Sequence, residues 1–313
     1  GGCFLQAESE IAAINMVYGA AGTGARVITS SSSPGISLKQ EGISYCAGAM
    51  VPAVIVNVMR GGPGLGNIQA SQGDYFQGTK GGGNGDYHLL TYAPASIQEF
   101  IDIMMFAYDK AEKYRIPVLF LADGIIAQMM EPVELPEMVD YKVDPEKKPW
   151  ACTGWKPGDD PKKRGIINSI YIDTETLAVH NDELQAMYKQ VTANEQMWEE
   201  YNCENAEYII TAFGTVARIA KSAINELKEK GIHVGLVRPI TVWPFPYDAV
   251  AKAVNQPSVK AVLDVELNEG QMLEDVKLAV CGTKPIDFTG HCGSQMPTTD
   301  EIVEKILSMK EGK

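Results

Sequence analysis

The first 66 residues repeat one pattern three times, and this repetition limits the possible folds more than any other feature. An apolar run, a turn of small residues and a helical stretch occur in QAESEIAAINMVYGAAGTG, in ARVITSSSSPGISLKQEG and in PAVIVNVMRGGPGLGNIQ. Each block is typical of one βα step, with a helix whose first turn faces the edge at which the strand ends. We therefore expect Glu10, a serine turn at 30–33 and Arg60 to lie on one rim.

The alternation continues beyond this opening. Apolar runs and helical spacing predict strands at 2–6, 25–29, 53–59 and 117–123, and helices at 10–22, 36–49 and 96–115. Between 61 and 86 the chain is rich in Gly, Gln and Asn and shows no period, so one long functional loop is expected. Ser96 and Glu99 have the spacing of a capping box at the start of the last helix.

A second strand–helix series follows a proline-rich, charged segment and a bridging helix at about 183–200. The expected strands are 207–212, 233–238, 259–265 and 285–289, and the expected helices are 215–230, 271–280 and two that start near 247 and 299. Such alternation predicts an α/β fold with two doubly wound, mainly parallel sheets. We divide the chain into a first domain at 1–130, a linker and bridging helix at 131–204, and a second domain at 205–313.

An acidic balance argues against several classes of partner. The 313 residues carry a formal net charge of −13, whereas nucleic acids and anionic membranes bind clustered Lys and Arg. No apolar run reaches the ~18 residues that a membrane span needs. The six cysteines are mostly far apart, which is typical of a reduced compartment. We expect a cytoplasmic protein without a nucleic-acid or membrane partner.

Spacing disfavours the common nucleotide, metal and hydrolase motifs. The glycines never complete G-x-G-x-x-G or G-x-x-x-x-G-K-[ST], and there is no G-x-S-x-G elbow. Cys281, His291 and Cys292 match neither zinc nor cluster spacing. We therefore expect no metal site in this chain, so that any iron–sulfur chemistry must come from another chain.

One carboxylate and one arginine remain as candidates for chemistry. Glu10 has an alternative role as a first-turn acid that stabilises the helix dipole. Arg60 has an alternative role as a surface charge at the end of a strand. Its position between an apolar strand and GGPGLG favours ligand binding instead, because the glycines permit close approach and the guanidinium suits a carboxylate.

At these blocks the sequence resembles the alpha subunit of 2-oxoacid:ferredoxin oxidoreductases, and the resemblance extends over the whole chain. The matching segments in the first half are ESEIAAINMVYGAAGTGARV, SSSSPGISLKQEGISY, VNVMRGGPGLGNIQASQGDYFQ, GGGNGDYH and LADGIIAQMMEP. Those in the second half are AFGTVARIAKSAINELKEKGIHVGLVRPITVWPFP and VLDVELNEGQMLEDV. GGGNGDYH and SSSSPGISLKQEG most resemble the 2-ketoisovalerate, or branched-chain, branch.

The resemblance implies a thiamine diphosphate enzyme that acts only with partner subunits. This chain would supply the pyrimidine-binding domain and a transketolase C-terminal-like domain. A beta subunit would hold the diphosphate and magnesium, and gamma and ferredoxin-like subunits would complete the complex, with [4Fe-4S] clusters on partners. A 2-oxoacid, coenzyme A and ferredoxin would be the reactants, and a homodimer contact is expected.

The resemblance also assigns individual residues. Glu10 matches the glutamate that hydrogen-bonds the aminopyrimidine and so promotes ylid formation, and Arg60 matches the arginine that pairs with the 2-oxoacid carboxylate. The segment beside the pyrimidine matches Ser32, Ser33, Pro34, Gly35 and Ile36.

One departure from the family and three alternatives stay open. The family's Tyr-Pro-Ile-Thr-Pro motif would lie upstream of Gly1, so we expect the first domain to lack its N-terminal start. The alternatives are a 2-oxoglutarate:ferredoxin oxidoreductase alpha subunit, a non-catalytic assembly subunit of the same fold, and a thiamine enzyme that passes acyl groups to lipoamide.

Overall fold

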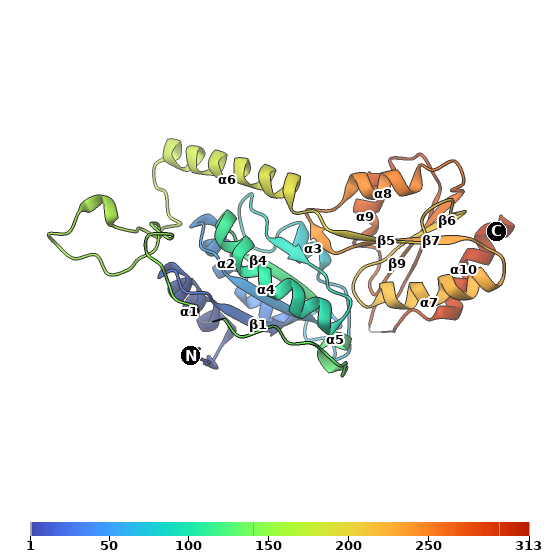
Figure 1. Cartoon of the computed structure of the whole chain (residues 1–313), viewed down its shortest axis with the longest axis horizontal. Coiled ribbons are helices and arrows are strands. Elements are labelled where there is room, and N and C mark those ends of the chain that lie inside the picture. Colours follow the sequence, from blue (N-terminus) through green and yellow to red (C-terminus); the bar gives the residue numbers. More distant parts are fainter. Residues whose placement is uncertain (1, 140, 294, 313) are drawn as a thin grey trace.

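Two five-stranded sheets lie one after the other along the long axis of the molecule (Figure 1). The structure is a computed structural model that describes residues 2–139, 141–293 and 295–312. The strand order in the first sheet is β1 (Ile28–Ser32), β2 (Val54–Met59), β4 (Val118–Asp123), β3 (Leu90–Tyr92) and β8 (Thr241–Trp243). In the second sheet it is β10 (Ile286–Gly290), β9 (Ala261–Glu266), β6 (Tyr208–Thr211), β7 (Val234–Pro239) and β5 (Trp198–Tyr201). Only the pairs made by β8 and β5 are antiparallel. The expected α/β class with two mainly parallel sheets is therefore confirmed.

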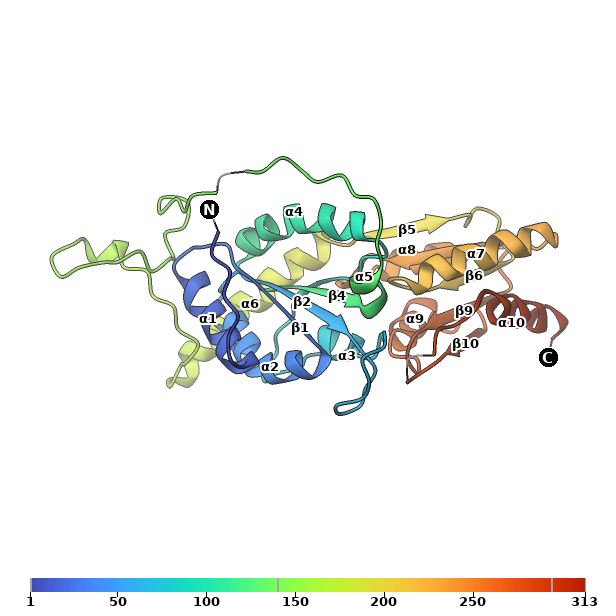
Figure 2. The ribbon, with the colours of Figure 1, turned by 90° about the horizontal axis from the view of Figure 1, so that it is seen from below.

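The first sheet and its helices come mostly from the first 128 residues. In chain order the elements are α1 (Glu10–Gly22), β1 (Ile28–Ser32), α2 (Ser33–Gly48), β2 (Val54–Met59), α3 (Tyr75–Thr79), β3 (Leu90–Tyr92), α4 (Ile97–Tyr114), β4 (Val118–Asp123) and α5 (Gly124–Gln128). Figure 2 shows α4 on one side of this sheet and α1, α2 and α3 on the other. Covered on both faces, β4 is buried at every residue and β2 at every residue but Val58, as expected of central parallel strands.

Several local expectations in this half are wrong. No strand forms at 2–6, which is irregular. The serines at 30–32 belong to β1 and not to a turn, because parallel pairing with β2 continues through Ser32, opposite Val58. The helix that follows starts directly at Ser33, with Pro34 in its first turn, where a missing N–H costs nothing. The stretch 61–86 contains the short α3, and β3 lies next to it in the chain.

The expected capping box at α4 forms only in part. Ser96 caps the helix by accepting a hydrogen bond from the Glu99 backbone N–H at 3.1 Å. The Glu99 carboxylate accepts instead from the Ala95 N–H and pairs with Arg238. The Glu99 carboxylate therefore binds the N–H one residue before the cap and a distant arginine, in place of the N–H of Ser96.

The segment between α5 and α6 (Thr174–Asn194) contains one short 3-10 helix at Pro161–Lys163 and extends beyond the first sheet at the left of Figure 1. Its beginning lies against α4, where the Glu134 N–H donates to Gln98 at 2.8 Å. The bridging helix starts and ends earlier than expected, because residues from Trp198 form β5 and pair with β7.

The second sheet follows β5 (Trp198–Tyr201). Its elements are β6 (Tyr208–Thr211), α7 (Val216–Glu229), β7 (Val234–Pro239), α8 (Tyr247–Val254), β9 (Ala261–Glu266), α9 (Leu273–Val280), β10 (Ile286–Gly290) and α10 (Thr299–Glu311). Helices α7 and α10 pack together on one face and α8 and α9 on the other (Figure 1). The expected capping box of Thr298 and Glu301 is present at α10.

The short strand β8 (Thr241–Trp243) joins the two halves of the chain. It follows β7 of the second sheet but pairs antiparallel with β3 of the first, with Thr91 opposite Trp243. No local pattern in the sequence predicts this strand, because three residues are too few to show a period.

A buried ion pair also connects the halves. Arg238 in β7 is 5% exposed and donates to both carboxylate oxygens of Glu99 in α4, at 2.7 and 2.8 Å. Its Nε donates to Glu199 of β5 at 2.8 Å. The N–H donors of the planar Arg238 guanidinium lie in one plane and thus bind two carboxylates from two different elements.

We expect Arg238→Met to lower the free energy of unfolding by about 2–3 kcal/mol, because the partly buried Glu99 loses its cation and Glu199 keeps only its second partner, Lys221. Urea unfolding followed by circular dichroism would measure the change. Lys230→Met is the control, since the exposed pair of Lys230 with Glu226 contributes less than about 0.5 kcal/mol. Equal losses in the two variants would contradict the assignment.

Candidate functional site

Two cavities open beside the start of α2, and each contains one of the two candidate residues. The first, here called the Glu10 cavity, has a volume of about 550 Å³ and is formed by residues 3–10, β1 and Lys39. The second, the Arg60 cavity, has a volume of about 390 Å³ and is formed by the start of α2, the loop after β2 and residues from the second half of the chain.

Glu10 is the first residue of α1 and has a free carboxylate. Ser9 caps the helix by accepting from the Ala12 N–H at 3.2 Å, which leaves the Glu10 side chain unused for capping. Half-buried, this side chain has no hydrogen bond or ion pair with any residue that the structure describes. A Cβ placed on Gly35 would lie 2.9 Å from Glu10 Oε1 and 2.1 Å from Ser31 Oγ, so glycine is needed for this close contact.

Arg60 follows β2 and is held through its backbone. The Arg60 N–H donates to Ser33 Oγ at 3.0 Å, and the Ser33 hydroxyl donates to Asp74 at 2.5 Å. The Asn57 amide also donates to Asp74, at 2.8 Å. These contacts fix the main chain at the carboxyl ends of β1 and β2, the edge at which ligands of open parallel sheets bind.

The guanidinium of Arg60, by contrast, is free. It forms no ion pair with the described part of the chain, and its Nε is buried without a hydrogen-bond acceptor. Of the described residues lining this cavity, it is the only Lys or Arg, whereas Asp74 and Glu269 are acidic. A buried donor with no acceptor is costly, so the cavity suits an anion that would pair with Arg60.

The structure brings some of the predicted segment 32–36 to the cavities. Ser33 and Pro34 line the Arg60 cavity, and Gly35 contacts Glu10. Ser32 ends β1 and Ile36 is fully buried in the core, and neither lines the Glu10 cavity or the Arg60 cavity. The start of α2 therefore separates the two candidate residues, which do not share one cavity.

Sequence reasoning missed two kinds of residue at the site. Asn268, Gln271 and Cys292 reach the Arg60 cavity from the second half of the chain, and no local pattern could reveal that. Lys39 in the Glu10 cavity was detectable, because it lies three residues after Ile36 and four before Ile43, on the apolar face of its helix.

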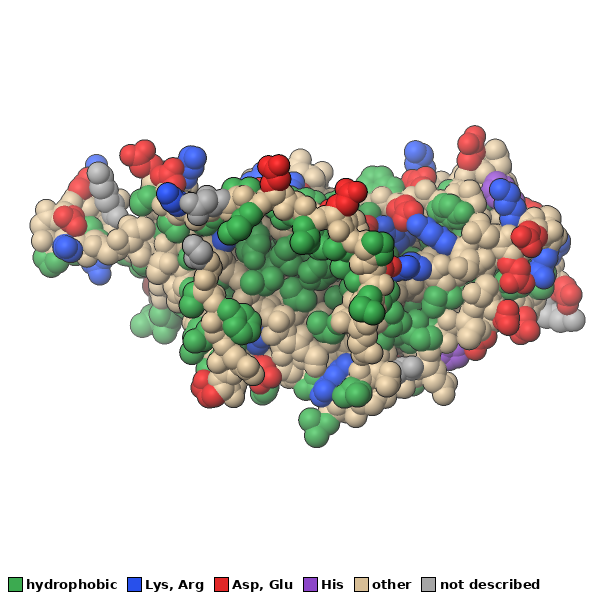
Figure 3. Space-filling view, turned by 60° about the horizontal axis from the view of Figure 1, so that its bottom comes forward, with side chains coloured by type: hydrophobic (Ala, Val, Ile, Leu, Met, Phe, Trp, Pro, Cys, Tyr) green, Lys and Arg blue, Asp and Glu red, His purple; other side chains and the backbone are tan. Residues whose placement is uncertain are grey.

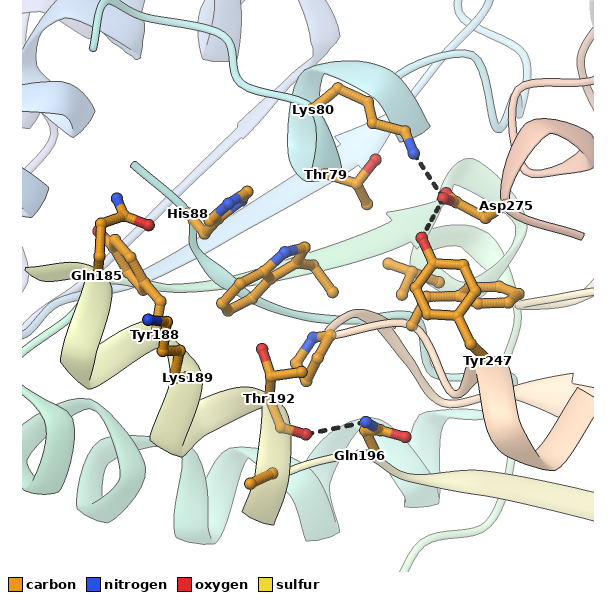
Figure 4. A pocket seen from close by; sticks show the side chains of 15 residues that line it. Thr79, Lys80, His88, Gln185, Tyr188, Lys189, Thr192, Gln196, Tyr247 and Asp275 are labelled. Atoms are coloured by element: carbon orange, nitrogen blue, oxygen red, sulfur yellow. Dashed lines mark hydrogen bonds and ion pairs between the residues drawn. The ribbon is translucent and has the colours of Figure 1, made fainter. Parts of the chain in front are cut away.

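A third cavity, of about 500 Å³, lies between α6, β8 and the end of α3, away from both candidates (Figure 4). There Lys80 and Tyr247 both point at Asp275, at 2.5 and 2.6 Å. Asp275 is 1% exposed and also accepts from Tyr75 at 2.7 Å. Burial, with the Asp275 carboxylate, raises the pKa of Tyr247. Because Asp275 lies in the first turn of α9 and Lys80 follows α3, this network connects the two halves of the chain.

Exposed apolar side chains surround the Glu10 cavity. Phe4, Leu5 and Ile28 line it and are 93%, 65% and 48% exposed. Further along, Ile11 of α1 and Leu38 of α2 are also exposed. Figure 3 shows hydrophobic side chains gathered in the middle of one face, between ends that carry most of the charges. Exposed apolar patches of this kind are typical of sites that contact a protein, a membrane or a ligand.

Neither a metal centre nor a membrane span is found in the described residues. Within 2–139, 141–293 and 295–312, no three His, Cys, Asp or Glu side chains are grouped closely enough to hold a metal ion. The longest apolar stretches of the described helices also fall short of what a membrane crossing requires.

Comparison with known proteins assigns the family. Residues 2–202 match the model described as "Pyruvate flavodoxin/ferredoxin oxidoreductase, thiamine diP-bdg", and 206–302 match "Pyruvate:ferredoxin oxidoreductase core domain II". The chain belongs to the pyruvate flavodoxin/ferredoxin oxidoreductase family. The resemblance read from the motifs is confirmed, and the two matched regions of this oxidoreductase chain meet near β5.

The chain is similar to subunits of two kinds of 2-oxoacid oxidoreductase. The ketoisovalerate oxidoreductase subunit VorB of Methanothermobacter thermautotrophicus is 45% identical over 304 residues, 97% of this chain and 84% of that protein. The 2-oxoglutarate synthase subunit KorA of Methanocaldococcus jannaschii is 32% identical over 332 residues, covering 98% and 87%. This oxidoreductase chain is thus more similar to the first of these two subunits.

Solved structures show the same fold. The 2-oxoglutarate:ferredoxin oxidoreductase from Magnetococcus marinus, with 2-oxoglutarate, coenzyme A and succinyl-CoA bound, matches with a TM-score of 0.80 at 24% identity, over 98% of this chain and 57% of that one. A split gene transketolase, as an inactive beta4 tetramer, gives 0.54 at 11% identity, covering 97% and 82%. This oxidoreductase chain spans little more than half the length of the first.

Proposed function

We propose that the chain is the alpha-type subunit of a thiamine diphosphate-dependent 2-oxoacid:ferredoxin oxidoreductase that uses 2-ketoisovalerate. The observation that carries this proposal is a pair of charged groups on either side of the start of α2, the Glu10 carboxylate and the Arg60 guanidinium, which have no partner among the described residues. A non-catalytic assembly subunit would have no need to keep both groups free of partners.

The Glu10 cavity fits the pyrimidine end of thiamine diphosphate. When bound there, the cofactor would supply the nucleophilic carbon and the electron sink that decarboxylation of a 2-oxoacid needs. Glu10 would hold a proton at the pyrimidine ring nitrogen, a role that needs a carboxylate with no other partner. Gly35 lets that carboxylate lie against the first turn of α2.

Arg60 would bind the carboxylate of the 2-oxoacid. Two parallel N–H donors fix both oxygens of such a group, and so orient the keto carbon. The Ser33 and Asp74 contacts hold the Arg60 backbone in place for this purpose.

The charges in the Arg60 cavity favour a monocarboxylate substrate. A dicarboxylate such as 2-oxoglutarate would need a second cation, yet Arg60 is accompanied by the acidic Asp74 and Glu269. This agrees with the 45% identity to a ketoisovalerate oxidoreductase subunit, against 32% to a 2-oxoglutarate synthase subunit.

The remaining parts of the reaction are assigned to partners. A beta subunit would hold the diphosphate and magnesium, and gamma and ferredoxin-like subunits would carry [4Fe-4S] clusters that pass electrons to ferredoxin while coenzyme A takes the acyl group. The apolar surface around the Glu10 cavity supports a partner contact or homodimer there. The six cysteines are free thiols, which supports a cytoplasmic complex.

Replacing Glu10 should abolish most activity. We expect Glu10→Gln to lower kcat by about 100-fold or more, since an amide cannot exchange the proton, and to weaken thiamine diphosphate binding. Ferredoxin reduction by the reconstituted complex and calorimetric titration with the cofactor would measure the two effects. Glu41→Gln, an exposed carboxylate on α2 outside both cavities, is the control, and unchanged kinetics in Glu10→Gln would remove Glu10 from the site.

Replacing Arg60 should act on substrate binding. We expect Arg60→Lys to raise the KM for the 2-oxoacid by roughly tenfold while kcat changes less, because an ammonium cannot make the two-pronged contact. Steady-state kinetics at saturating coenzyme A would test it, with the exposed Arg164→Lys as control. A KM equal to that of the unaltered complex would contradict the role of Arg60.

Substrate choice can be tested directly. We expect kcat/KM for 2-ketoisovalerate to exceed that for 2-oxoglutarate by at least about 100-fold, because the second carboxylate would lie unpaired among acidic groups. Parallel assays of ferredoxin reduction with both acids, and with pyruvate as a short monocarboxylate, would measure the ratio. A preference for 2-oxoglutarate would favour the alternative branch, and activity only with a lipoyl acceptor would contradict the ferredoxin assignment.

A further inference from the structure

A fully buried lysine lies at the Glu10 cavity with no acidic partner in contact. Lys39 is 1% exposed, and its Nζ donates to Thr29 Oγ1 at 2.7 Å and to the Ser30 carbonyl oxygen at 3.2 Å. Both acceptors are neutral, so they offset only part of the free energy needed to remove an ammonium from water. A methionine of similar length would fill this space without that loss. The charge of Lys39 therefore needs an explanation other than packing.

Glu10 is the charge that faces this ammonium. Both residues line the Glu10 cavity, and the Glu10 side chain lies against Gly35, about one helical turn before Lys39 on α2. Burial lowers the pKa of Lys39, whereas the Glu10 carboxylate acts in the opposite direction and favours the ammonium. Because the two charges have opposite signs, the ammonium and the Glu10 carboxylate attract each other across the cavity. The pair makes no direct contact, so the Glu10 oxygens stay available to a ligand.

The other titratable groups of the cavity do not replace this interaction. The N-terminal segment contributes Cys3 and Glu8, both exposed. Glu8 is acidic and would oppose the ionisation of Glu10, while solvent screens its charge. Strand β1 contributes only neutral groups, among them Thr29 and Ser30. Lys39 is thus the only cation among the described residues that line the cavity.

We propose that Lys39 is a positioning residue, whose ammonium, fixed by Thr29 and Ser30, keeps the Glu10 carboxylate ionised and ready to hold a proton at the pyrimidine nitrogen of thiamine diphosphate. This inference rests on the proposed function of Glu10 and adds to it the group that sets its ionisation. Lys39 touches neither substrate nor cofactor in this role and acts through Glu10 alone.

The consequence is a defined change with pH. Without the cation, none of the described residues that line the cavity carries a positive charge to disfavour protonation of the Glu10 carboxylate, and a protonated carboxyl no longer accepts the proton. Affinity for thiamine diphosphate should fall as the pH is lowered, and we call this fall the acidic limb. In Lys39→Met the acidic limb should therefore lie about one pH unit higher than in the unaltered complex. Thr29→Val removes the hydroxyl that fixes the ammonium and should give a smaller shift in the same direction.

The test uses the assembled complex after removal of its cofactor. Calorimetric titration with thiamine diphosphate and magnesium, between about pH 5 and 8, gives the dissociation constant at each pH. Near-ultraviolet circular dichroism of the bound cofactor reports the protonation of its pyrimidine and does not depend on turnover. The matched control is Lys148→Met: Lys148 is also buried, at 7% exposed, but binds the Gly24 carbonyl and Glu112 outside both cavities. Its pH profile should match that of the unaltered complex.

The possible outcomes distinguish the role of Lys39 from the role of Glu10. A shift in Lys39→Met but not in Lys148→Met supports the role of Lys39, and superimposable profiles overturn it. Should Lys39→Met fail to assemble, Thr29→Val decides, and an unchanged limb there overturns the inference. Glu10→Gln should remove the limb altogether. If the acidic limb persists in Glu10→Gln, the assignment of Glu10 is wrong. If the limb is lost in Glu10→Gln but does not shift in Lys39→Met, only the role of Lys39 is rejected.

Discussion

The hydroxyl group of Ser33 holds the functional edge of the first sheet together. It accepts a hydrogen bond from the Arg60 backbone and donates one to Asp74, so a single oxygen connects the end of β1, the end of β2 and the start of α3. Asn57 from inside β2 completes the arrangement by donating to the same carboxylate. Because these groups are backbone or short side chains, they leave the long guanidinium of Arg60 free to meet a ligand.

The division of the site into two cavities follows from this construction. The first turn of α2 lies between Glu10 and Arg60, with Gly35 turned to one and Ser33 to the other. In the proposed function, Glu10 would hold the pyrimidine of the cofactor on one side of this turn, and Arg60 would hold the substrate carboxylate on the other. The edge of the sheet beside the Glu10 cavity is also where apolar side chains such as Phe4 and Ile28 are exposed, so the remaining wall of the site is open to a second polypeptide.

Much of the fold and of the candidate site could be predicted from the sequence, and the features that could not be predicted have physical causes. The buried runs at β2 and β4 and the amphipathic helices gave clear periods, so the α/β class and most element positions were predicted correctly. The serines of β1 were assigned to a turn because their propensity favours one, but pairing with β2 overrides a local preference. Strand β8 and the contact of Glu99 with Arg238 depend on residues about 150 positions apart, which no local pattern contains. For the same reason, Glu10 and Arg60 could be named from the sequence, whereas their placement in separate cavities could not.

Strand β8 has a consequence for the order in which the protein is made. The first sheet takes one edge strand from residues 241–243, so it stays incomplete while the ribosome adds more than a hundred residues after β4. During that interval β3 presents an unpaired edge, a surface that invites association with other nascent chains. The two halves are thus coupled in biosynthesis as well as in space, and separating them at the linker would leave the first half permanently in this unprotected form.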